Sequence, residues 1–193
     1  MKRLGILASH RGTNFQAIVD ACHDGRLQAD VVVAISNNSR SIALQRARQA
    51  GIDTAHLSNI THTNPDHLDQ AILEQLLRHG VDLVITAGYM KQLGPKTLLR
   101  YAGRLLNIHP SLLPKYGGKG MYGKHVHQAV IDADDTETGI TIHWVEGDYD
   151  TGPIIAQHTI PVLENDTPES LSERILTIEH ELLITTLSGL LEQ

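Results

Sequence analysis

The amino-acid sequence predicts an α/β fold: a Rossmann-like, doubly wound and mostly parallel sheet with a C-terminal antiparallel hairpin and helix. Two observations support this prediction. Apolar strand patterns alternate with amphipathic helix patterns along almost the whole chain, an order that produces a parallel sheet covered by helices on both faces. Near the C-terminus, strand patterns at 140–145 and 153–157 follow one another with no helix between them, as in an antiparallel hairpin.

The first half of the chain contains three predicted strands, each followed by a predicted helix. Apolar runs predict strands at 3–9, 30–35 and 54–57. Helical spacing predicts helices that begin near Phe15, at Ser41 and at Pro65. Gly51 suits the left-handed cap after the second helix, and Pro65 suits the first position of the third, which continues to Gly80.

The second half continues the alternation and then departs from it. Apolar runs predict two further strands, at 81–87 and 101–106. A short helix from Pro95 separates them, and a glycine-rich loop then leads to a helix near 126–131. The hairpin strands follow, joined by a loop that holds Asp150. The last helix starts at Thr167 and carries apolar residues at helical spacing: Leu171, Ile175, Ile178, Leu182 and Leu183.

Composition and charge predict one globular domain over residues 1–193. The chain is long enough to bury a core, and 41% of its residues are hydrophobic. The formal net charge of −6 argues against broad electrostatic binding of nucleic acid. Cys22 is the single cysteine and cannot form an internal disulfide, which favours the reducing cytoplasm. The short apolar run after Met1 is neither a signal peptide nor a membrane span, so no membrane partner is expected.

The most informative polar residues stand at the end of the 101–106 run. Asn107 and His109 are two residues apart, so on a strand they lie on one face, with Ile108 on the other. Pro110 ends the strand because it has no N–H to donate. Ligands bind at this carboxyl edge in open α/β sheets, so we expect an amide donor and an imidazole side by side in a site. The alternative is a pair that only satisfies local backbone groups.

Four segments together resemble a known family. They are the turn at 10–14, the strand and glycine turn at 81–90, the pattern Asn-x-His-x-Ser-Leu-Leu-Pro within 106–114, and the pattern Asp-x-Asp-x-Gly-Pro within 147–153. This set resembles the phosphoribosylglycinamide formyltransferase family, the folate-dependent enzymes of purine synthesis, from about residue 3 to about residue 183. The resemblance implies transfer of the formyl group of 10-formyltetrahydrofolate to the amine of 5-phosphoribosylglycinamide.

Formyl transfer to an amine passes through a tetrahedral intermediate, which needs donors for its oxyanion and a route for a proton to the leaving nitrogen. Asn107 offers a fixed amide donor, and His109 offers one whose charge can rise. The resemblance implies that Asp150 is the carboxylate that orients His109, because the family motif places its acid just before Thr-Gly-Pro. Asp148 is the rival, with a solvated turn carboxylate as its simpler interpretation. No activated Ser or Cys nucleophile is evident, which favours direct transfer.

The turn after the first strand is the predicted anion site. Gly12 lets the backbone approach a ligand, and Thr13 and Asn14 can cap the following helix while N–H groups point outward. The alternative is an ordinary helix cap beside a flexible turn. The resemblance implies that six residues bind the phosphoribosyl substrate: Gly12, Thr13, Asn14, Phe15, Gln16 and Glu179. For Glu179 the alternative is a carboxylate on a helix surface.

The resemblance also implies a folate pocket that shares Asn107 with the catalytic group. Its other residues are consecutive: Met90, Lys91, Gln92 and Leu93. The alternative is a helix entry that packs Met90 and Leu93 into the core. Several relatives carry a basic residue where this chain has Asn64 and Pro65, so the residue that holds the glutamate tail of folate is not identified.

The loop 115–123 looks about five residues longer than in the best-known relatives, and its glycines suit a lid, with a variable surface loop as the alternative. His125 and His127 could chelate a metal on a strand. The segment is predicted to enter a helix and no third ligand is apparent, so no metal is expected.

Three other functions fit the sequence less well. Formyltetrahydrofolate hydrolysis is performed by relatives with an extra N-terminal domain, for which a strand beginning at residue 3 leaves no room. Methionyl-tRNA formyltransferases carry an added C-terminal domain and a more basic surface. A catalytically silent folate- or phosphometabolite-binding module would not need Asn107, His109 and Asp150 together.

Overall fold

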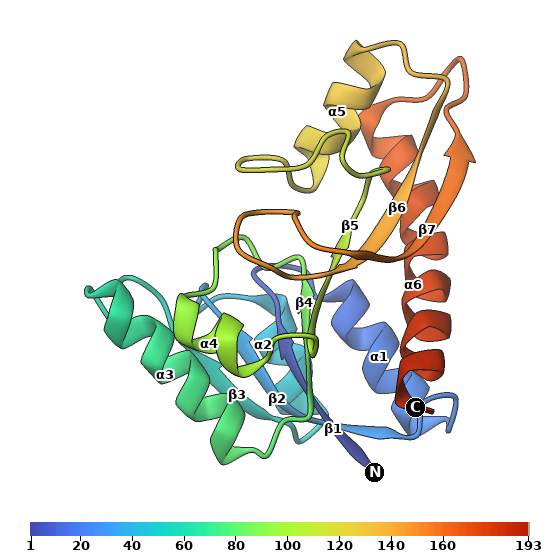
Figure 1. The fold of residues 1–193 in the computed structure, drawn as a ribbon. Coiled ribbons are helices and arrows are strands. Elements are labelled where there is room, and N and C mark those ends of the chain that lie inside the picture. Colours follow the sequence, from blue (N-terminus) through green and yellow to red (C-terminus); the bar gives the residue numbers. More distant parts are fainter. Residues whose placement is uncertain (193) are drawn as a thin grey trace.

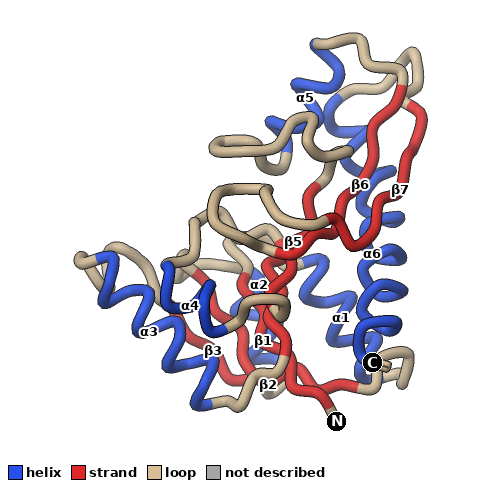
Figure 2. The backbone as a smooth tube through the Cα atoms, viewed as in Figure 1, coloured by secondary structure: helices blue, strands red, loops and turns tan. Residues whose placement is uncertain are grey.

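The described residues of the computed structural model, 1–192, form one seven-stranded sheet with helices on both faces (Figures 1 and 2). The strands are β1 (Lys2–Leu7), β2 (Ala29–Ser36), β3 (Asp53–His56), β4 (Leu83–Ala87), β5 (Leu105–His109), β6 (Glu137–Trp144) and β7 (Ile154–Pro161). The helices are α1 (Thr13–His23), α2 (Ile42–Gln49), α3 (Pro65–Arg78), α4 (Pro95–Arg100), α5 (Lys124–Asp132) and α6 (Pro168–Leu191). No helix among these residues is long and apolar enough to span a bilayer.

The strand order is β3-β2-β1-β4-β5-β6-β7, and the predicted fold class is confirmed. Strands β1 to β5 pair in parallel, whereas β6 is antiparallel to both β5 and β7. The chain moves outward from β1 to β3 and then returns to place β4 on the other side of β1. Such a reversal is the point at which open α/β sheets bind ligands, at the carboxyl ends of the strands.

The two faces of the sheet are covered by separate apolar clusters. Side chains of β1 alternate between them, as strand geometry requires. One cluster joins the sheet to α1, α2 and α6 through Leu4, Ile6, Phe15, Leu44 and Leu183. The other joins it to α3 through Leu7, Val33, Ile72, Leu76 and Tyr101. Full burial of one such aliphatic side chain is worth about 1.5–3 kcal/mol, so the two clusters hold the helices against the sheet.

Several element boundaries differ from the sequence prediction. Strand β5 begins at Leu105, not at Tyr101, because Tyr101 follows α4 and is fully buried, with its hydroxyl donating to the Val81 carbonyl at 3.2 Å. Helix α1 begins at Thr13 and not at Phe15. The sequence pattern of 101–106 alone cannot show whether Tyr101 belongs to the strand or packs beside it.

A buried carboxylate fixes the start of α4 and the loop before it. Asp69 on α3 is 3% exposed and accepts hydrogen bonds from the backbone N–H groups of Lys96 (2.8 Å) and Thr97 (3.1 Å) and from the Thr97 hydroxyl (2.6 Å). A Cβ placed at Gly94 would lie 2.3 Å from the Asp69 carboxyl carbon. The carboxylate therefore acts as a helix cap supplied by a neighbouring helix.

We predict that Asp69→Ala lowers the free energy of unfolding by roughly 2–3 kcal/mol, because it leaves buried donors without an acceptor. Denaturant unfolding monitored by circular dichroism measures this. Asp66→Ala is the control, since Asp66 is exposed in the first turn of α3 and its loss should cost less than about 1 kcal/mol. Equal effects of the two substitutions would show that the buried cap adds no more to the free energy of unfolding than an exposed carboxylate does.

Candidate active site

The carboxylate of Asp150 gathers the polar residues at the end of β5. Its Oδ1 lies 3.3 Å from His109 Nδ1 and accepts a hydrogen bond from Asn107 Nδ2 at 3.2 Å. Its Oδ2 accepts from the Gly118 backbone N–H at 2.9 Å. The sequence prediction that Asn107 and His109 share one strand face agrees with this geometry, because both reach the same oxygen. Asp148, the rival carboxylate, is exposed and lies away from the imidazole on the same loop.

The charge on Asp150 is strongly stabilised. Burial acts to raise its pKa, but the hydrogen bond from His109, the charge on His109 and the Gly118 N–H together hold the pKa well below the usual range of a carboxyl group. The residue also has a φ of 54°, in the left-handed region that Asp and Asn tolerate better than most side chains. The local backbone is therefore shaped to aim this carboxylate inward.

His109 lies between two hydrogen-bond acceptors. Its Nδ1 faces the Asp150 carboxylate, and its Nε2 lies 2.8 Å from the Tyr116 carbonyl oxygen. A carbonyl can only accept, so Nε2 must carry a proton in this arrangement. Only the doubly protonated ring can donate to both neighbours at once. The side chain is 4% exposed, so water does not replace either partner.

The amide of Asn107 is held on both of its ends. The Thr86 hydroxyl donates to its Oδ1 at 2.8 Å, and its Nδ2 lies 3.1 Å from His143 Nε2. His143 is 1% exposed on β6. Sequence reasoning gave His143 no role, because its place beside Asn107 depends on the antiparallel register in which the two residues pair.

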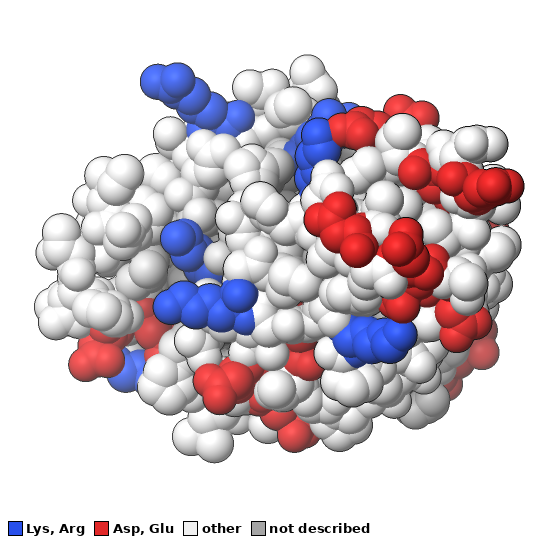
Figure 3. Space-filling model, turned by 90° about the horizontal axis from the view of Figure 1, so that it is seen from above, with Lys and Arg blue, Asp and Glu red and all other residues white. Residues whose placement is uncertain are grey.

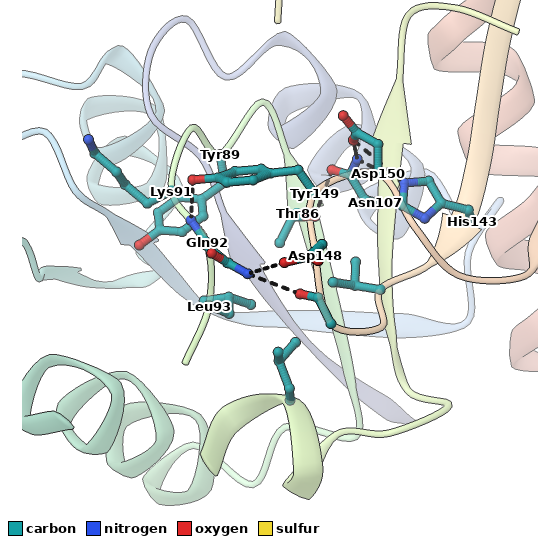
Figure 4. Close-up of a pocket in the computed structure, with 13 residues that line it drawn as sticks. Thr86, Tyr89, Lys91, Gln92, Leu93, Asn107, His143, Asp148, Tyr149 and Asp150 are labelled. Carbon is teal, nitrogen blue, oxygen red and sulfur yellow. Dashed lines mark hydrogen bonds and ion pairs between the residues drawn. The ribbon is translucent and has the colours of Figure 1, made fainter. Parts of the chain in front are cut away.

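A cleft opens beside these groups (Figure 4). In Figure 4, Asn107, His143 and Asp150 lie together at one end of it. Its lining is Thr86, Tyr89, Lys91, Gln92, Leu93, Leu98, Asn107, His143, Val145, Gly147, Asp148, Tyr149 and Asp150. The cleft is thus walled by the loops after β4 and β6, and His109 is not one of its lining residues.

Gln92 ties the two loops of the cleft together. Its backbone N–H donates to the Tyr149 hydroxyl at 3.0 Å, and its side-chain amide donates to the Gly147 carbonyl at 3.2 Å. Three of the four predicted folate residues, Lys91, Gln92 and Leu93, line the cleft. Met90 does not, because its N–H donates to the Ser9 hydroxyl and its sulfur lies 3.0 Å from His10 Nε2.

The turn after β1 packs tightly against α2. Gly12 has a φ of 66°, and a Cβ there would lie 2.6 Å from the Ala43 Cβ. It occupies the N-cap position of α1 with no side-chain cap, so the expectation that Thr13 and Asn14 cap the helix is wrong. Without a side-chain acceptor, the first-turn N–H groups of α1 remain available to an anion.

The other predicted substrate residues divide into two groups. Phe15 is fully buried in the core, so only its backbone can reach a ligand. Gln16 donates to Asp20 and accepts from Arg46.

Asn14 and Glu179 form a pair at the start of α1. Asn14 Nδ2 donates to Glu179 Oε1 at 2.9 Å, joining α1 to α6. The Oδ1 of Asn14 is buried without a hydrogen-bond partner among the described residues. Burial raises the pKa of Glu179 to about 7, although the Asn14 hydrogen bond and the charge on His109 act in the opposite direction.

The glycine-rich loop belongs to the site through its backbone. Residues 117–123 form neither helix nor strand, and the Gly118 N–H and Tyr116 carbonyl contact Asp150 and His109. Asn64 caps α3 by accepting from the N–H groups of Asp66 and His67.

The histidine pair after the loop lies on a helix, as predicted. His125 and His127 are in the first turns of α5. Burial, and then the charge on His109, lower the pKa of His127 to about 4. Among residues 1–192, no group of three or more His, Cys, Asp or Glu side chains is arranged to hold a metal ion.

Comparison with known proteins identifies the family. The family described as Formyl transferase matches residues 2–187. The phosphoribosylglycinamide formyltransferase of Haemophilus influenzae is 41% identical over 94% of this chain and 84% of its own length. The chain belongs to the phosphoribosylglycinamide formyltransferase family. The chloroplastic phosphoribosylglycinamide formyltransferase of Arabidopsis thaliana is 39% identical over the whole chain, which spans 66% of that relative. The crystal structure of glycinamide ribonucleotide transformylase 1 from Symbiobacterium toebii superposes with a TM-score of 0.93 at 40% identity, covering 100% of this chain and 88% of that one.

Membership of this family assigns the enzyme class and confirms the resemblance seen in the sequence. The chain is a formyltransferase, a one-carbon transferase of purine biosynthesis, and its family uses formyl-tetrahydrofolate as co-substrate.

The raised pKa of Glu179 predicts a pH-dependent stability. The folded state holds the proton up to about pH 7, whereas the unfolded state releases it near 4.5. The contribution of Glu179 to the free energy of unfolding is therefore complete below pH 4.5 and is lost as the pH rises through 7. Relative to Glu179→Gln, the wild-type free energy of unfolding should fall by roughly 2–3 kcal/mol across that window, at about 1.4 kcal/mol per pKa unit.

Urea unfolding of both proteins at several pH values measures this difference. Glu181→Gln is the matched control, because Glu181 is exposed on the same helix, and its difference from wild type should not vary with pH. A wild-type minus Glu179→Gln difference that is flat from pH 4.5 to 7 would contradict the proposed protonation.

Proposed function

We propose that this chain transfers the formyl group of 10-formyltetrahydrofolate to the amine of 5-phosphoribosylglycinamide by direct attack, with Asn107, His109 and Asp150 as its catalytic residues. The single observation that carries the proposal is that one carboxylate oxygen, Asp150 Oδ1, contacts both His109 Nδ1 and Asn107 Nδ2 beside an open cleft. One continuous sheet through the described residues supports a single formyltransferase domain.

The oxyanion of the tetrahedral intermediate needs preorganised donors. Asn107 and His109 supply N–H groups from one strand face. The His109 Nε2–H would reach the oxyanion by releasing the Tyr116 carbonyl, from which Nε2 lies 2.8 Å away. An imidazolium is the stronger donor because its charge complements the developing oxyanion. The Asp150 carboxylate stabilises that imidazolium. Since the pKa of Asp150 is held well below its usual range, the carboxylate is a weak base at neutral pH. Asp150 therefore acts through its fixed charge, and His109 is the group suited to deliver a proton to the leaving nitrogen.

Direct attack is supported by the state of the Ser111 hydroxyl. Ser111 is fully buried, and its hydroxyl donates to the Lys115 carbonyl at 2.6 Å. A serine that already donates to a carbonyl has no base to activate it. The amine of the substrate is then the nucleophile, and no covalent enzyme intermediate is needed.

We infer that the phosphate of the ribonucleotide binds at the start of α1. The uncapped N–H groups of the first helical turn and the helix dipole both favour an anion there. Gly12, Thr13 and Asn14 supply backbone contacts, with Phe15 and Gln16 adjoining through their backbone. Glu179, which accepts a hydrogen bond from Asn14, would contact the sugar or glycinamide part.

The folate is proposed to occupy the cleft beside Asn107. Lys91, Gln92 and Leu93 would contact it directly, because they line the cleft. Met90 would shape the wall from behind through its bond to Ser9. A pocket with apolar walls and a few directed polar groups suits a flat, partly polar ring system.

A nucleic-acid substrate is less well supported. The face seen in Figure 3 carries separate Lys and Arg side chains and a gathering of Asp and Glu side chains on its right. Binding of a polynucleotide depends on a continuous basic surface. The described residues on this face do not form one, which favours small-molecule substrates over a tRNA.

Turnover tests the proposed function directly. The purified protein, incubated with 10-formyltetrahydrofolate and 5-phosphoribosylglycinamide, should consume both and release tetrahydrofolate. Omission of the ribonucleotide should stop folate consumption. Equal consumption without it would identify a hydrolase, and no consumption in either reaction would identify a silent binding module.

Asp150→Asn should lower kcat by roughly 10²-fold or more, the scale of lost oxyanion and proton-transfer stabilisation, with little change in the KM of either substrate. Asn keeps the size of the side chain and tolerates its positive φ. Asp148→Asn makes the same chemical change two residues away in the same loop and should alter kcat by less than about threefold. If Asp148→Asn is the more damaging change, the wrong carboxylate has been chosen.

A further inference from the structure

His143 is a buried histidine that touches the catalytic group without a role in the reaction described above. Its ring is held at both nitrogens. Nδ1 lies 2.8 Å from the Trp144 carbonyl oxygen. Nε2 lies 3.1 Å from Asn107 Nδ2 and 3.8 Å from Asp150 Oδ1, the second of which is too long for a hydrogen bond. The Trp144 carbonyl and the Asp150 carboxylate can accept hydrogen bonds but cannot donate them. This determines both which nitrogen of the ring is protonated and how the Asn107 amide is oriented.

The Trp144 carbonyl determines which nitrogen of His143 carries a hydrogen. A carbonyl oxygen only accepts, so the nitrogen facing it, His143 Nδ1, carries the hydrogen. A neutral imidazole has one N–H, which leaves Nε2 as a bare acceptor. The atom of Asn107 that faces Nε2 must then be a donor, which is the amide nitrogen and not the amide oxygen.

The same orientation follows independently from Asp150. Its ionised carboxylate only accepts, and it lies 3.2 Å from the same terminal atom of Asn107. A flipped amide would place two acceptor oxygens against each other at that distance, with no hydrogen between them. The Trp144 carbonyl, acting through His143, and the Asp150 carboxylate therefore require the same orientation of the Asn107 amide.

The opposite end of the amide completes the arrangement. The Thr86 hydroxyl lies 2.8 Å from Asn107 Oδ1 and 3.1 Å from the Leu106 carbonyl. Its single hydrogen can be donated to Asn107 Oδ1, which is the shorter contact. Thr86 on β4, Asn107 on β5 and His143 on β6 come from three adjacent strands, so the amide is clamped by the sheet itself.

We propose that His143, in its neutral Nδ1–H form, is a positioning residue that fixes the Asn107 amide with its N–H groups directed into the active site. The role rests on the proposed function, in which Asn107 donates to the formyl oxygen. Asn107 Nδ2 has two hydrogens, directed at His143 Nε2 and at Asp150 Oδ1. The bond to His143 keeps the amide from turning when the reacting oxygen competes for the hydrogen shared with Asp150.

The tautomer is tested on the wild-type protein without turnover. Long-range ¹H–¹⁵N correlation spectra of the ¹⁵N-labelled enzyme, with His143 assigned by comparison with His143→Gln, should show a protonated Nδ1 and an unprotonated Nε2. A ring protonated at Nε2 alone, or at both nitrogens, would overturn the inference. This measurement is independent of activity, so it separates failure of this inference from failure of the proposed reaction.

The positioning role is tested by a double-mutant cycle. His143→Phe removes the acceptor but keeps a ring of similar size, and should lower kcat by roughly tenfold, less than the roughly 10²-fold expected for losing a donor outright. In an Asn107→Ala background the same change should alter kcat by less than about twofold, because its effect acts through Asn107. His158→Phe, on the exposed face of β7, should leave kcat unchanged in both backgrounds. An equal loss from His143→Phe with and without Asn107 would show that His143 acts in another way.

Discussion

The buried carboxylate of Asp150 is the group on which the arrangement of the active site depends. Removing an ionised carboxylate from water is costly unless donors replace the lost hydration. Here Asn107 and His109 on β5 and the Gly118 N–H supply them. The same bonds therefore join β5, the loop after β6 and the glycine-rich loop around one charge. Each of those elements is positioned because the carboxylate needs its donor.

The sheet provides the frame for this carboxylate by bringing chain segments that are distant in sequence to one edge. The parallel strands β1, β4 and β5 all end there, so the turn before α1, the loop after β4 and the Asn107–His109 pair share a surface. The antiparallel strand β6 then runs back along β5, which sets His143 opposite Asn107. The loop after β6 folds over the strands and brings Asp150 to Asn107 and His109. The reversal of strand direction therefore contributes one residue beside Asn107 directly and a second through the loop that follows.

The sequence predicted the features that depend on local patterns. Strand and helix alternation determined the fold class, and the spacing of Asn107 and His109 placed them on one face. Features that depend on contacts between distant segments were not predictable. The position of His143 follows from a register across two strands, and the need for glycine at position 12 follows from the approach of Ala43. The family resemblance implied that Met90 lines the folate pocket, but its contacts with Ser9 and His10 hold it outside the lining.

The charge on His109 acts on two carboxyl groups, Asp150 and Glu179, whose environments move their pKa values in opposite directions. Burial is the largest influence on both and acts to raise both. Asp150 receives enough donors to reverse that effect, whereas Glu179 receives one side-chain hydrogen bond, from Asn14, and keeps a pKa of about 7. Two carboxyl groups with such different pKa values can take different roles in one active site. The permanent charge of Asp150 suits a residue that must stabilise an imidazolium. Glu179 can donate or accept a hydrogen bond near neutral pH, which suits contact with a substrate hydroxyl or with an amine whose hydrogens change during the reaction.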